Sequence, residues 1–181
     1  LSSSSAASDV YKRQALDTAI KPLVIPGKDV LHIVGPALTV FSGAADVLGM
    51  SIALSEVQPG DVIVNGVSGF QGTAAVGDRI AGMIKNNGGL GLITDGPMRD
   101  WEGIKETGLS CFCTGLNPNS PYNSGPAKIG YPIEIGGKTI DSGDIIVADA
   151  DGVTVVPFNM IDKVIEKLQS CLLYTSPSPR D

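Results

Sequence analysis

Two adjacent charged side chains follow a buried apolar segment near the middle of the chain. The segment D-G-P-M-R-D occupies residues 95–100, comes directly after the apolar run at residues 90–94, and ends in Arg99 and Asp100. Open α/β sheets bind ligands at the carboxyl ends of their strands, so this position favours a functional site. Arg99 and Asp100 are either a capped helix start with an ion pair, or a substrate-binding arginine beside a metal ligand. From residue types alone, the helix cap is favoured.

A glycine-rich loop that leads into a helix forms the second candidate site. Glycines recur over residues 66–72, and a helical pattern is predicted over residues 75–87. The backbone N–H groups at a helix start lack partners within the helix and lie at the positive end of its dipole. Such a start binds carboxylate or phosphate without a charged side chain. By itself the loop is a weak sign of function, because glycine-rich turns before helices are common.

The spacing between the two segments resembles that of one protein family. Asp78 is followed by twenty residues and then by Arg99-Asp100, a D-x20-R-D pattern. Three further segments resemble the family in the same order, namely P-G-D-V-I-V at residues 59–64, N-P-N-S-P at residues 117–121 and G-D-I-I-V-A-D-A-D-G-V at residues 143–153. With these segments in register, the chain resembles the RraA-like family and its 4-hydroxy-4-methyl-2-oxoglutarate aldolase branch, and the resemblance covers nearly all of residues 15–170.

The resemblance implies roles for individual residues. Asp100 would bind a divalent cation, Mg²⁺ or Mn²⁺, since hard cations prefer oxygen ligands and keep several waters. Arg99 would contact the substrate and offset enolate charge, and Asp78 would hold a metal-bound water, so these two are the catalytic candidates. The substrate carboxylate would be received by backbone N–H groups at four positions, which are Gly77, Asp78, Arg79 and Ile80. Glu is more usual than Asp at position 78, and leucines are more usual at positions 79 and 80.

The function implied is that of a carbon–carbon lyase. It would be a divalent-metal-dependent (class II) aldolase that cleaves 4-hydroxy-4-methyl-2-oxoglutarate-type 2-oxo acids to pyruvate and decarboxylates oxaloacetate, without a lysine Schiff base. Family members imply a cytoplasmic homotrimer or hexamer whose active sites lie between subunits. The alternative is a non-catalytic regulator of ribonuclease E, a branch that lacks the metal-ligating acid, so Asp100 favours the enzyme. A phosphohistidine carrier would need a loop histidine, and His32 lies in an apolar segment.

The composition of the chain limits the kinds of partner that the protein is expected to bind. The chain carries a formal net charge of −6, has a sequence pI near 4.7 and is 43% hydrophobic. An acidic surface repels nucleic acid, so a broad nucleic-acid-binding groove is not expected. No apolar run approaches the roughly 20 residues that a membrane-spanning helix needs.

The two ends of the chain are predicted to be artefacts. Residues 9–14 and residues 171–176 can be encoded by one DNA sequence read on opposite strands, and that DNA resembles a sequencing-library adapter. Residues 1–14 and residues 171–181 are therefore set aside, and an RraA-like domain is expected over residues 15–170, truncated at both ends. These ends should make few contacts with the core.

The apolar pattern predicts a single α/β domain with layered sheets, and the resemblance implies a swivelling β/β/α domain. Strands are expected over residues 31–41 with a bend at Gly35-Pro36, and over 61–67, 90–94, 109–114, 129–135, 138–140, 144–148 and 153–156. Helices are expected over residues 46–57, 75–87, 99–107 and 159–169.

Several other residues are interpreted as structural. Cys111 and Cys113 are expected to pack on one face of a strand, because alternate strand residues point the same way. His32 is expected to lie in the core, and Trp101 to pack against the protein rather than line a pocket. Asp149 and Asp151, the remaining pair, flank a predicted hairpin whose turn they would stabilise.

Overall fold

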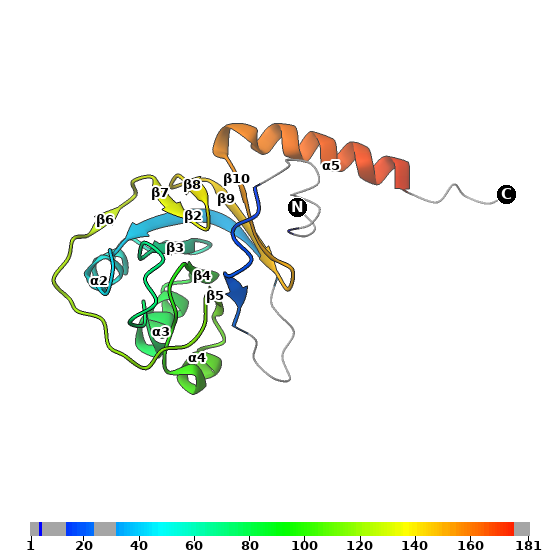
Figure 1. The fold of residues 1–181 in the computed structure, drawn as a ribbon. Helices are drawn as coiled ribbons and strands as arrows, with labels where there is room; N and C mark the ends of the chain where they lie inside the picture. The colour runs from blue at the N-terminus through cyan, green and yellow to red at the C-terminus, as the bar shows by residue number, and fades with distance from the viewer. Residues whose placement is uncertain (1–3, 5–13, 24–31, 176–181) are drawn as a thin grey trace.

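The computed structural model describes residue 4, residues 14–23 and residues 32–175, with backbone only for residues 171–175. Figure 1 shows a curved sheet with helices α2, α3 and α4 on one face and the β7–β8 hairpin over the other. The strands are β1 (Lys21–Pro22), β2 (Ile33–Phe41), β3 (Val62–Gly66), β4 (Gly91–Thr94), β5 (Ser110–Cys113), β6 (Lys128–Ile129), β7 (Ile133–Ile135), β8 (Lys138–Ile140), β9 (Ile145–Asp149) and β10 (Gly152–Val156). The helices are α2 (Leu48–Ala53), α3 (Asp78–Asn86), α4 (Trp101–Thr107), the 3-10 helix η1 (Phe158–Met160) and α5 (Ile161–Thr175).

Strand β2 joins two parts of the main sheet. Its first half pairs antiparallel with β9 up to Pro36, and its second half pairs in parallel with β3 from Ala37 onward. The sheet order is β1-β5-β4-β3-β2-β9-β10, with β6 also paired to β2. The strand therefore changes partner at the Gly35-Pro36 step, where the sequence predicts a bend. Gly35 is required there, because a Cβ would lie 2.3 Å from the carbonyl oxygen of Gly60.

Alternate residues of the central strands enter two different cores. Val62 and Val64 of β3 pack with the β7–β10 side of the sheet, whereas Ile63 packs against the helices. The first core also holds Phe112, and the second holds Cys111 and Cys113, both buried and free. This period of two is what a strand buried on both faces requires. The predicted β/β/α layering is confirmed, and both cysteines pack as expected.

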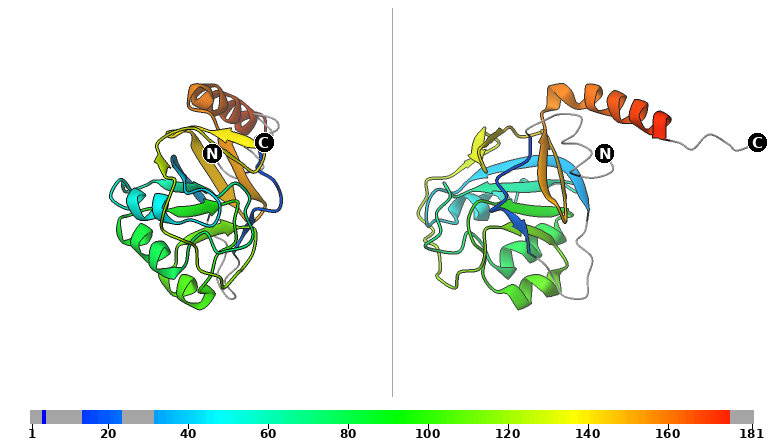
Figure 2. Two further views of the ribbon diagram at one scale, coloured as in Figure 1. Left: turned by 60° about the vertical axis from the view of Figure 1, so that its left-hand side comes forward. Right: turned by 45° about the vertical axis from the view of Figure 1, so that its right-hand side comes forward.

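Helix α5 lies apart from these layers. Figure 2 shows it projecting beyond the body of the domain, with only its first turns against the β9–β10 hairpin. Val164 is buried there with Val147 and Val156 in a small third cluster. None of the helices described is long and apolar enough to cross a membrane.

Several predicted element boundaries were wrong, and the helix expected over residues 46–57 is confined to Leu48–Ala53. The strand expected over residues 129–135 is interrupted, because Gly130 has a positive φ of 78° and separates β6 from β7. Helices α3 and α4 begin three and two residues later than predicted, since the residues before them extend the strand edge instead. The last helix continues to Thr175, past residue 170.

The ends of the chain are described only in part. Ser4 is buried, and its backbone N–H and hydroxyl both donate to the carboxylate of Asp149, at 2.9 and 2.6 Å. Residues 1–14 were expected to make few contacts with the core, and the hydrogen bonds of Ser4 do not agree with that expectation. Tyr11 lies outside the described residues, as do the side chains of Leu172 and Leu173. The domain boundaries at residues 15 and 170 therefore stay a prediction.

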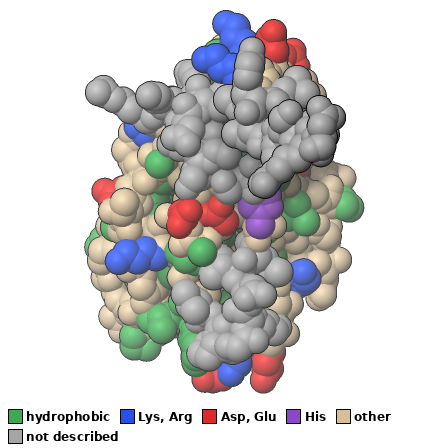
Figure 3. All heavy atoms as spheres, turned by 90° about the vertical axis from the view of Figure 1, so that its right-hand side faces the viewer, with side chains coloured by type: hydrophobic (Ala, Val, Ile, Leu, Met, Phe, Trp, Pro, Cys, Tyr) green, Lys and Arg blue, Asp and Glu red, His purple; other side chains and the backbone are tan. Residues whose placement is uncertain are grey.

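The prediction that His32 is a core residue was wrong. It is exposed immediately before β2, and Figure 3 shows the histidine beside acidic side chains. Burial alone would raise the pKa of the Asp149 carboxyl, but hydrogen bonds from Ser4 and Asp151 and the nearby His32 hold that pKa below its usual value. Asp149 accepts the N–H of Asp151 across the hairpin turn, which is the structural role expected of this pair.

Candidate active site

Three loops meet at one edge of the sheet. Strands β3, β4 and β5 run parallel, so the loops that follow them leave from the same edge. The loops continue the strand pairing, because Met98 forms parallel bridges with Val76 on one side and with Leu116 on the other. Met98 is fully buried, and its N–H donates to Gly115 while its carbonyl accepts the N–H of Asn117, both at 2.9 Å. This backbone ladder fixes the residue that follows, Arg99.

Asp95 holds the glycine-rich loop in place through hydrogen bonds to its backbone. Its two carboxylate oxygens accept the backbone N–H groups of Val67 and Gly69, each at 2.7 Å. Desolvation raises the pKa of this buried carboxyl above its ordinary value, although the two N–H donors act in the opposite direction. Ser68, between the two donors, adopts a left-handed φ of 57°. Asp95 thus shapes the loop rather than facing the pocket described below.

Helix α3 starts at the end of the glycine-rich loop. Gly77 is its N-cap residue in an extended conformation, and its carbonyl accepts the first helical hydrogen bond, from Ala81 at 3.2 Å. The N–H groups of the first turn, residues 78–80, lie before that bond and have no acceptor within the helix. Residues 78–80 line a pocket, so an anion bound there beside the helix start would meet both these donors and the positive end of the helix dipole.

Gly77 also makes room for the two charged residues of the next loop. A Cβ at this position would lie 2.4 Å from Oδ2 of Asp100 and 3.2 Å from Cγ of Arg99. Any side chain here would therefore push the Asp100 carboxylate and the Arg99 stem away from the start of α3. The sequence predicts Gly77 as a source of a backbone donor, and the structure adds this steric role.

Asp100 has a left-handed backbone and a carboxylate that caps no helix. It adopts the left-handed conformation at φ 60° and ψ 46°, which Asp tolerates better than most residues. It is the N-cap residue of α4, yet its side chain makes no capping hydrogen bond. Its Oδ2 atom lies 3.3 Å from Nε of Arg99, with the two side chains 45% and 34% exposed. The helix-cap interpretation was therefore wrong, although the ion pair that accompanied it is present.

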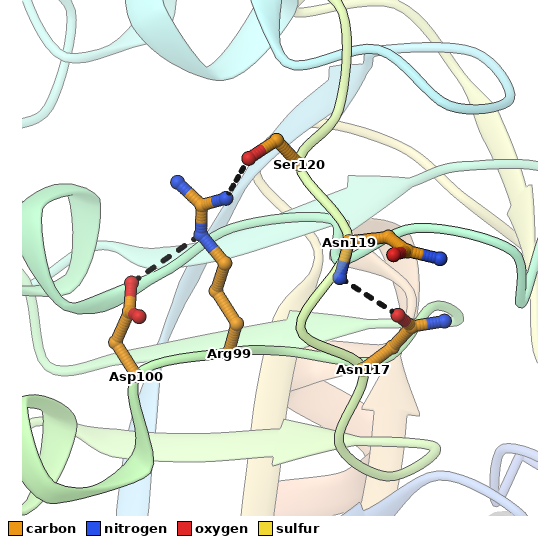
Figure 4. Close-up of polar contacts among 5 residues, drawn as sticks. All are labelled: Arg99, Asp100, Asn117, Asn119 and Ser120. Carbon is orange, nitrogen blue, oxygen red and sulfur yellow. Dashed lines mark hydrogen bonds and ion pairs between the residues drawn. The ribbon is translucent and has the colours of Figure 1, made fainter.

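Arg99 is held from a second side. Its Nη1 atom donates to the hydroxyl oxygen of Ser120, in the loop after β5, as Figure 4 shows. The guanidinium therefore lies between a carboxylate from its own loop and a hydroxyl from the next loop. Sequence reasoning noted residues 117–121 only as a family-like segment and gave Ser120 no role. A polar residue in an Asn- and Pro-rich loop after a strand was the available signal.

All of the predicted site residues line one pocket of about 550 Å³. One wall is polar and comes from the starts of α3 and α4 together with Ser120, and the other is mainly apolar and comes from α2 and α3. The residues predicted for substrate and metal that meet here are Gly77, Asp78, Arg79, Ile80, Arg99 and Asp100. Trp101 is not among the lining residues described, and the ammonium of Lys105 lies 5.5 Å from its ring centre.

Sequence reasoning missed a second glycine at this site. A Cβ on Gly103, in the first turn of α4, would lie 2.4 Å from Oδ2 of Asp78 and 2.6 Å from its Cβ. The Asp78 side chain is therefore packed against α4, one turn beyond Asp100. A glycine inside a predicted helix, where it weakens helix formation, was the signal that close packing occurs at that point.

The pocket offers few ligands for a metal ion. Among the described residues, no group of three or more His, Cys, Asp or Glu side chains is placed to hold one. A site of the zinc type is therefore not built from this part of the chain. The lone Asp100 carboxylate, open to the pocket and kept clear by Gly77, fits a cation such as Mg²⁺, which is held by one or two carboxylates and keeps most of its waters.

Comparisons with known proteins agree with this architecture. The family model described as "RraA-like: Aldolase/RraA" matches residues 4–155. A protein of Halalkalibacterium halodurans named "Putative 4-hydroxy-4-methyl-2-oxoglutarate aldolase" is 39% identical over 152 residues, which are 84% of this chain and 70% of that protein. Protein DlpA of Legionella pneumophila is 32% identical over 155 residues, but these cover only 25% of its length and 82% of this chain.

A solved structure shares the fold over most of its length. RraAS2 of Streptomyces coelicolor, described as an unusual member of the RNase ES inhibitor RraA protein family, superposes with a TM-score of 0.81 at 27% identity. The match covers 95% of this chain and 89% of that one. The family model alone spans most of the chain, so the chain belongs to the RraA-like family.

Proposed function

We propose that the protein is a divalent-metal-dependent aldolase that releases pyruvate from 4-hydroxy-4-methyl-2-oxoglutarate-type 2-oxo acids and also decarboxylates oxaloacetate. The observation that carries the proposal is the pocket itself. It combines the free N–H groups at the start of α3, the Arg99 guanidinium and an Asp100 carboxylate that caps no helix. The relative at 39% identity that is named as such an aldolase supports the same activity.

The substrate carboxylate would bind at the start of α3. The N–H groups of residues 78–80 have no acceptor within the helix and would donate to an anion there, and backbone donors serve this purpose whatever their side chains. That is why Arg79 and Ile80, in place of the more usual leucines, leave the site intact. Arg99 would donate to the 2-oxo oxygen, where negative charge develops as the C–C bond breaks, and its planar multi-donor head suits that oxygen.

Asp100 would hold Mg²⁺ or Mn²⁺, and Asp78 would accept a hydrogen bond from one of the waters that such a cation keeps. When bound, the cation supplies a Lewis acid beside the 2-oxo group. No lysine lines the described pocket, so a Schiff base has no nucleophile there. In the aldol cleavage a base takes the proton of the substrate hydroxyl, its carbon becomes a keto carbon, and the C–C bond breaks with its electron pair passing to the pyruvate enolate fragment. A proton then converts that fragment to pyruvate. In decarboxylation CO₂ departs and leaves the same fragment.

A pyruvate-release assay tests the proposal. Purified protein is given 4-hydroxy-4-methyl-2-oxoglutarate or oxaloacetate with Mg²⁺, with Mn²⁺ and with a chelator. We expect turnover of both substrates that chelator removes and added cation restores. Turnover that resists the chelator would contradict the metal assignment. No turnover of either substrate would instead favour a non-catalytic regulator of ribonuclease E, since the description of the Streptomyces relative names its family as RNase ES inhibitors.

The substrate class, the oligomeric state and the cellular location are parts of the same proposal. A small 2-oxo acid is the proposed substrate, the proposed assembly is a homotrimer or hexamer, and the proposed location is the cytoplasm. Light scattering of the purified protein measures the assembly directly, and a mass of one subunit would contradict it.

A further inference from the structure

The loop at residues 117–121 forms the side of the pocket that faces Arg99. Ser120 lines the pocket, and its hydroxyl oxygen accepts a hydrogen bond from Nη1 of Arg99. On the other side of the guanidinium, Nε lies 3.3 Å from Oδ2 of Asp100. Figure 4 shows the guanidinium between these two oxygens, which come from different loops. The head of Arg99 is therefore fixed at two points rather than one.

The loop that carries Ser120 is itself held in place. The side-chain amide of Asn119 donates to the carbonyl of Gly72 at 3.0 Å, and the Asn119 carbonyl accepts the N–H of Ala74 at 2.9 Å. The side-chain amide of Asn117 donates to the carbonyl of Gln71 at 2.8 Å. All three partners belong to the glycine-rich loop that leads into α3. The position of Ser120 is therefore tied to the segment that carries the proposed carboxylate donors.

Arg99 needs this support because its backbone alone does not orient its head. The Arg99 N–H donates to the carbonyl of Val76 at 3.1 Å, which fixes the Cα atom. Beyond that atom the side chain has several rotatable bonds and is 34% exposed, and ordering such a chain costs conformational entropy. An oxygen that accepts from Nη1 selects one orientation of the planar head before substrate arrives.

We propose that Ser120 is a positioning residue that orients the Arg99 guanidinium, and that the Asn117 and Asn119 contacts keep Ser120 in register with the start of α3. The inference rests on the proposed function for the role of Arg99 in catalysis. The structural part of the inference is that Ser120 orders the Arg99 side chain, and this part can be tested whether or not the protein is an enzyme. Because Ser120 acts through Arg99, its removal matters only while Arg99 is present.

Kinetics of matched serine variants test the catalytic half. Ser120→Ala should lower kcat/KM for pyruvate release by roughly tenfold, the usual effect of losing one hydrogen bond to a charged group. Ser120→Thr keeps the hydroxyl and should recover most of that loss. Ser55→Ala removes a hydroxyl from an exposed residue beyond α2, outside the pocket, and serves as the control. A Ser120→Ala rate equal to that of the control would overturn the proposal.

A double-mutant cycle separates positioning from general structural damage. If Ser120 acts through Arg99, adding Ser120→Ala to Arg99→Lys should change the rate little further. If it merely supports the fold, the serine change should cost the same factor in both backgrounds, and that result would overturn the proposal.

A measurement on the side chain tests the structural half without any substrate. The ¹⁵N order parameter of Arg99 Nη1, the atom that donates to Ser120, should be high in the wild type and fall in Ser120→Ala toward that of Arg79, an exposed arginine with no ion-pair partner among the described residues. Ser120→Thr should keep it high, and loss of the signal in Arg99→Lys identifies the resonance. An unchanged order parameter in Ser120→Ala would refute the positioning role. If the wild type releases no pyruvate, the proposed function fails, but this measurement still decides whether Ser120 orders Arg99.

Discussion

Two groups of aspartates at the same edge of the sheet are used in opposite ways. Asp46 and Asp95 are buried, and backbone N–H groups donate to both oxygens of each carboxylate. Asp78 and Asp100 line the pocket, and no backbone N–H of the described residues is seen to donate to either carboxylate. A carboxylate surrounded by amides holds loops together, whereas one left open can meet a cation, a water or a substrate. The next predictions change each kind of aspartate and its neighbours.

The largest effect is expected at Asp100. Asp100→Ala should abolish metal-dependent pyruvate formation, since it removes the anionic oxygen ligand proposed for the cation. Calorimetric titration with Mn²⁺ should show the loss of binding directly. Stability should fall by about 1 kcal/mol, because alanine tolerates the left-handed backbone of residue 100 less well than aspartate does. Loss of the carboxylate itself should add little, since it makes no capping bond and its ion pair is exposed.

Asp100→Asn is the matched control for stability. Asparagine tolerates the left-handed backbone, so the free energy of unfolding of this variant in urea should stay within about 0.5 kcal/mol of wild type. An Asp100→Ala variant that retains near wild-type turnover would show that the family chemistry has been assigned to the wrong residue.

Arg99→Lys should cost about a hundredfold in kcat, the size of effect seen when one hydrogen-bond donor to a developing negative charge is removed. An ammonium is a point charge, and it cannot contact Asp100, Ser120 and a substrate oxygen together as the planar guanidinium can. Steady-state kinetics on oxaloacetate measures the loss. A lysine variant within a few-fold of wild type would mean that only the charge of Arg99 matters, and not its geometry.

Asp46→Asn should act on folding instead. Asp46 accepts from Leu48 at 2.8 Å, Ser124 at 2.7 Å and Gly125 at 3.0 Å, and an amide would turn its N–H₂ group toward some of these donors. The loss should be about 2 kcal/mol in the free energy of unfolding at pH 7, as for other hydrogen bonds to charged groups. Urea unfolding of Asp46→Asn beside the matched Asp100→Asn variant tests whether only the buried aspartate supports the fold. Equal unfolding midpoints for the two variants would contradict this difference.

The pH dependence of the two buried aspartates should have opposite signs. Burial alone would raise the pKa of Asp46, but its backbone donors prevail and hold that pKa below 3.8. Its stabilisation is therefore present above pH 3.8 and is lost as the pH falls through the folded pKa. The pKa of Asp95 is raised above 3.8 by desolvation, so its contribution is present below pH 3.8 and is lost as the pH rises through its folded pKa. Differences in unfolding free energy between wild type and each Asn variant, measured from acid to neutral pH, should slope in opposite directions.

Much of this arrangement could be predicted from the sequence, because it depends on local patterns. Apolar runs located the central strands, whereas the meeting of Asp78, Arg99 and Asp100 in one pocket was expected only from the family resemblance that the D-x20-R-D spacing carries. The contact between Arg99 and Ser120 could not be predicted, since it joins residues from loops whose relative position is set by the sheet order. His32 was misplaced because an apolar neighbourhood predicts a strand but not where that strand begins.

Asp78→Asn should have a smaller effect than either change in the Arg99-Asp100 pair. The amide oxygen can still accept a hydrogen bond from a cation-bound water, but the negative charge is lost, so we expect roughly a tenfold decrease in kcat. The substrate carboxylate should still bind, because its donors are backbone N–H groups, and KM should change little. A larger effect on KM than on kcat would indicate that Asp78 contacts the substrate itself rather than a cation-bound water.

Gly103→Ala tests whether the position of the Asp78 carboxylate matters as well as its charge. The new methyl group would lie 2.4 Å from Oδ2 and 2.6 Å from Cβ of Asp78, so the whole side chain must move. Alanine is the better helix former by about 1 kcal/mol, which offsets part of the steric cost in α4. We therefore expect a several-fold loss of kcat with nearly unchanged stability. Gly82→Ala in α3, where the nearest atom to the new methyl is 3.7 Å away, is the matched control and should keep wild-type activity. If Gly103→Ala also keeps wild-type kcat, Asp78 does not need its place against α4. If Gly103→Ala adds nothing to Asp78→Asn, the two residues act as one unit, since the glycine then matters only through the carboxylate that packs on it.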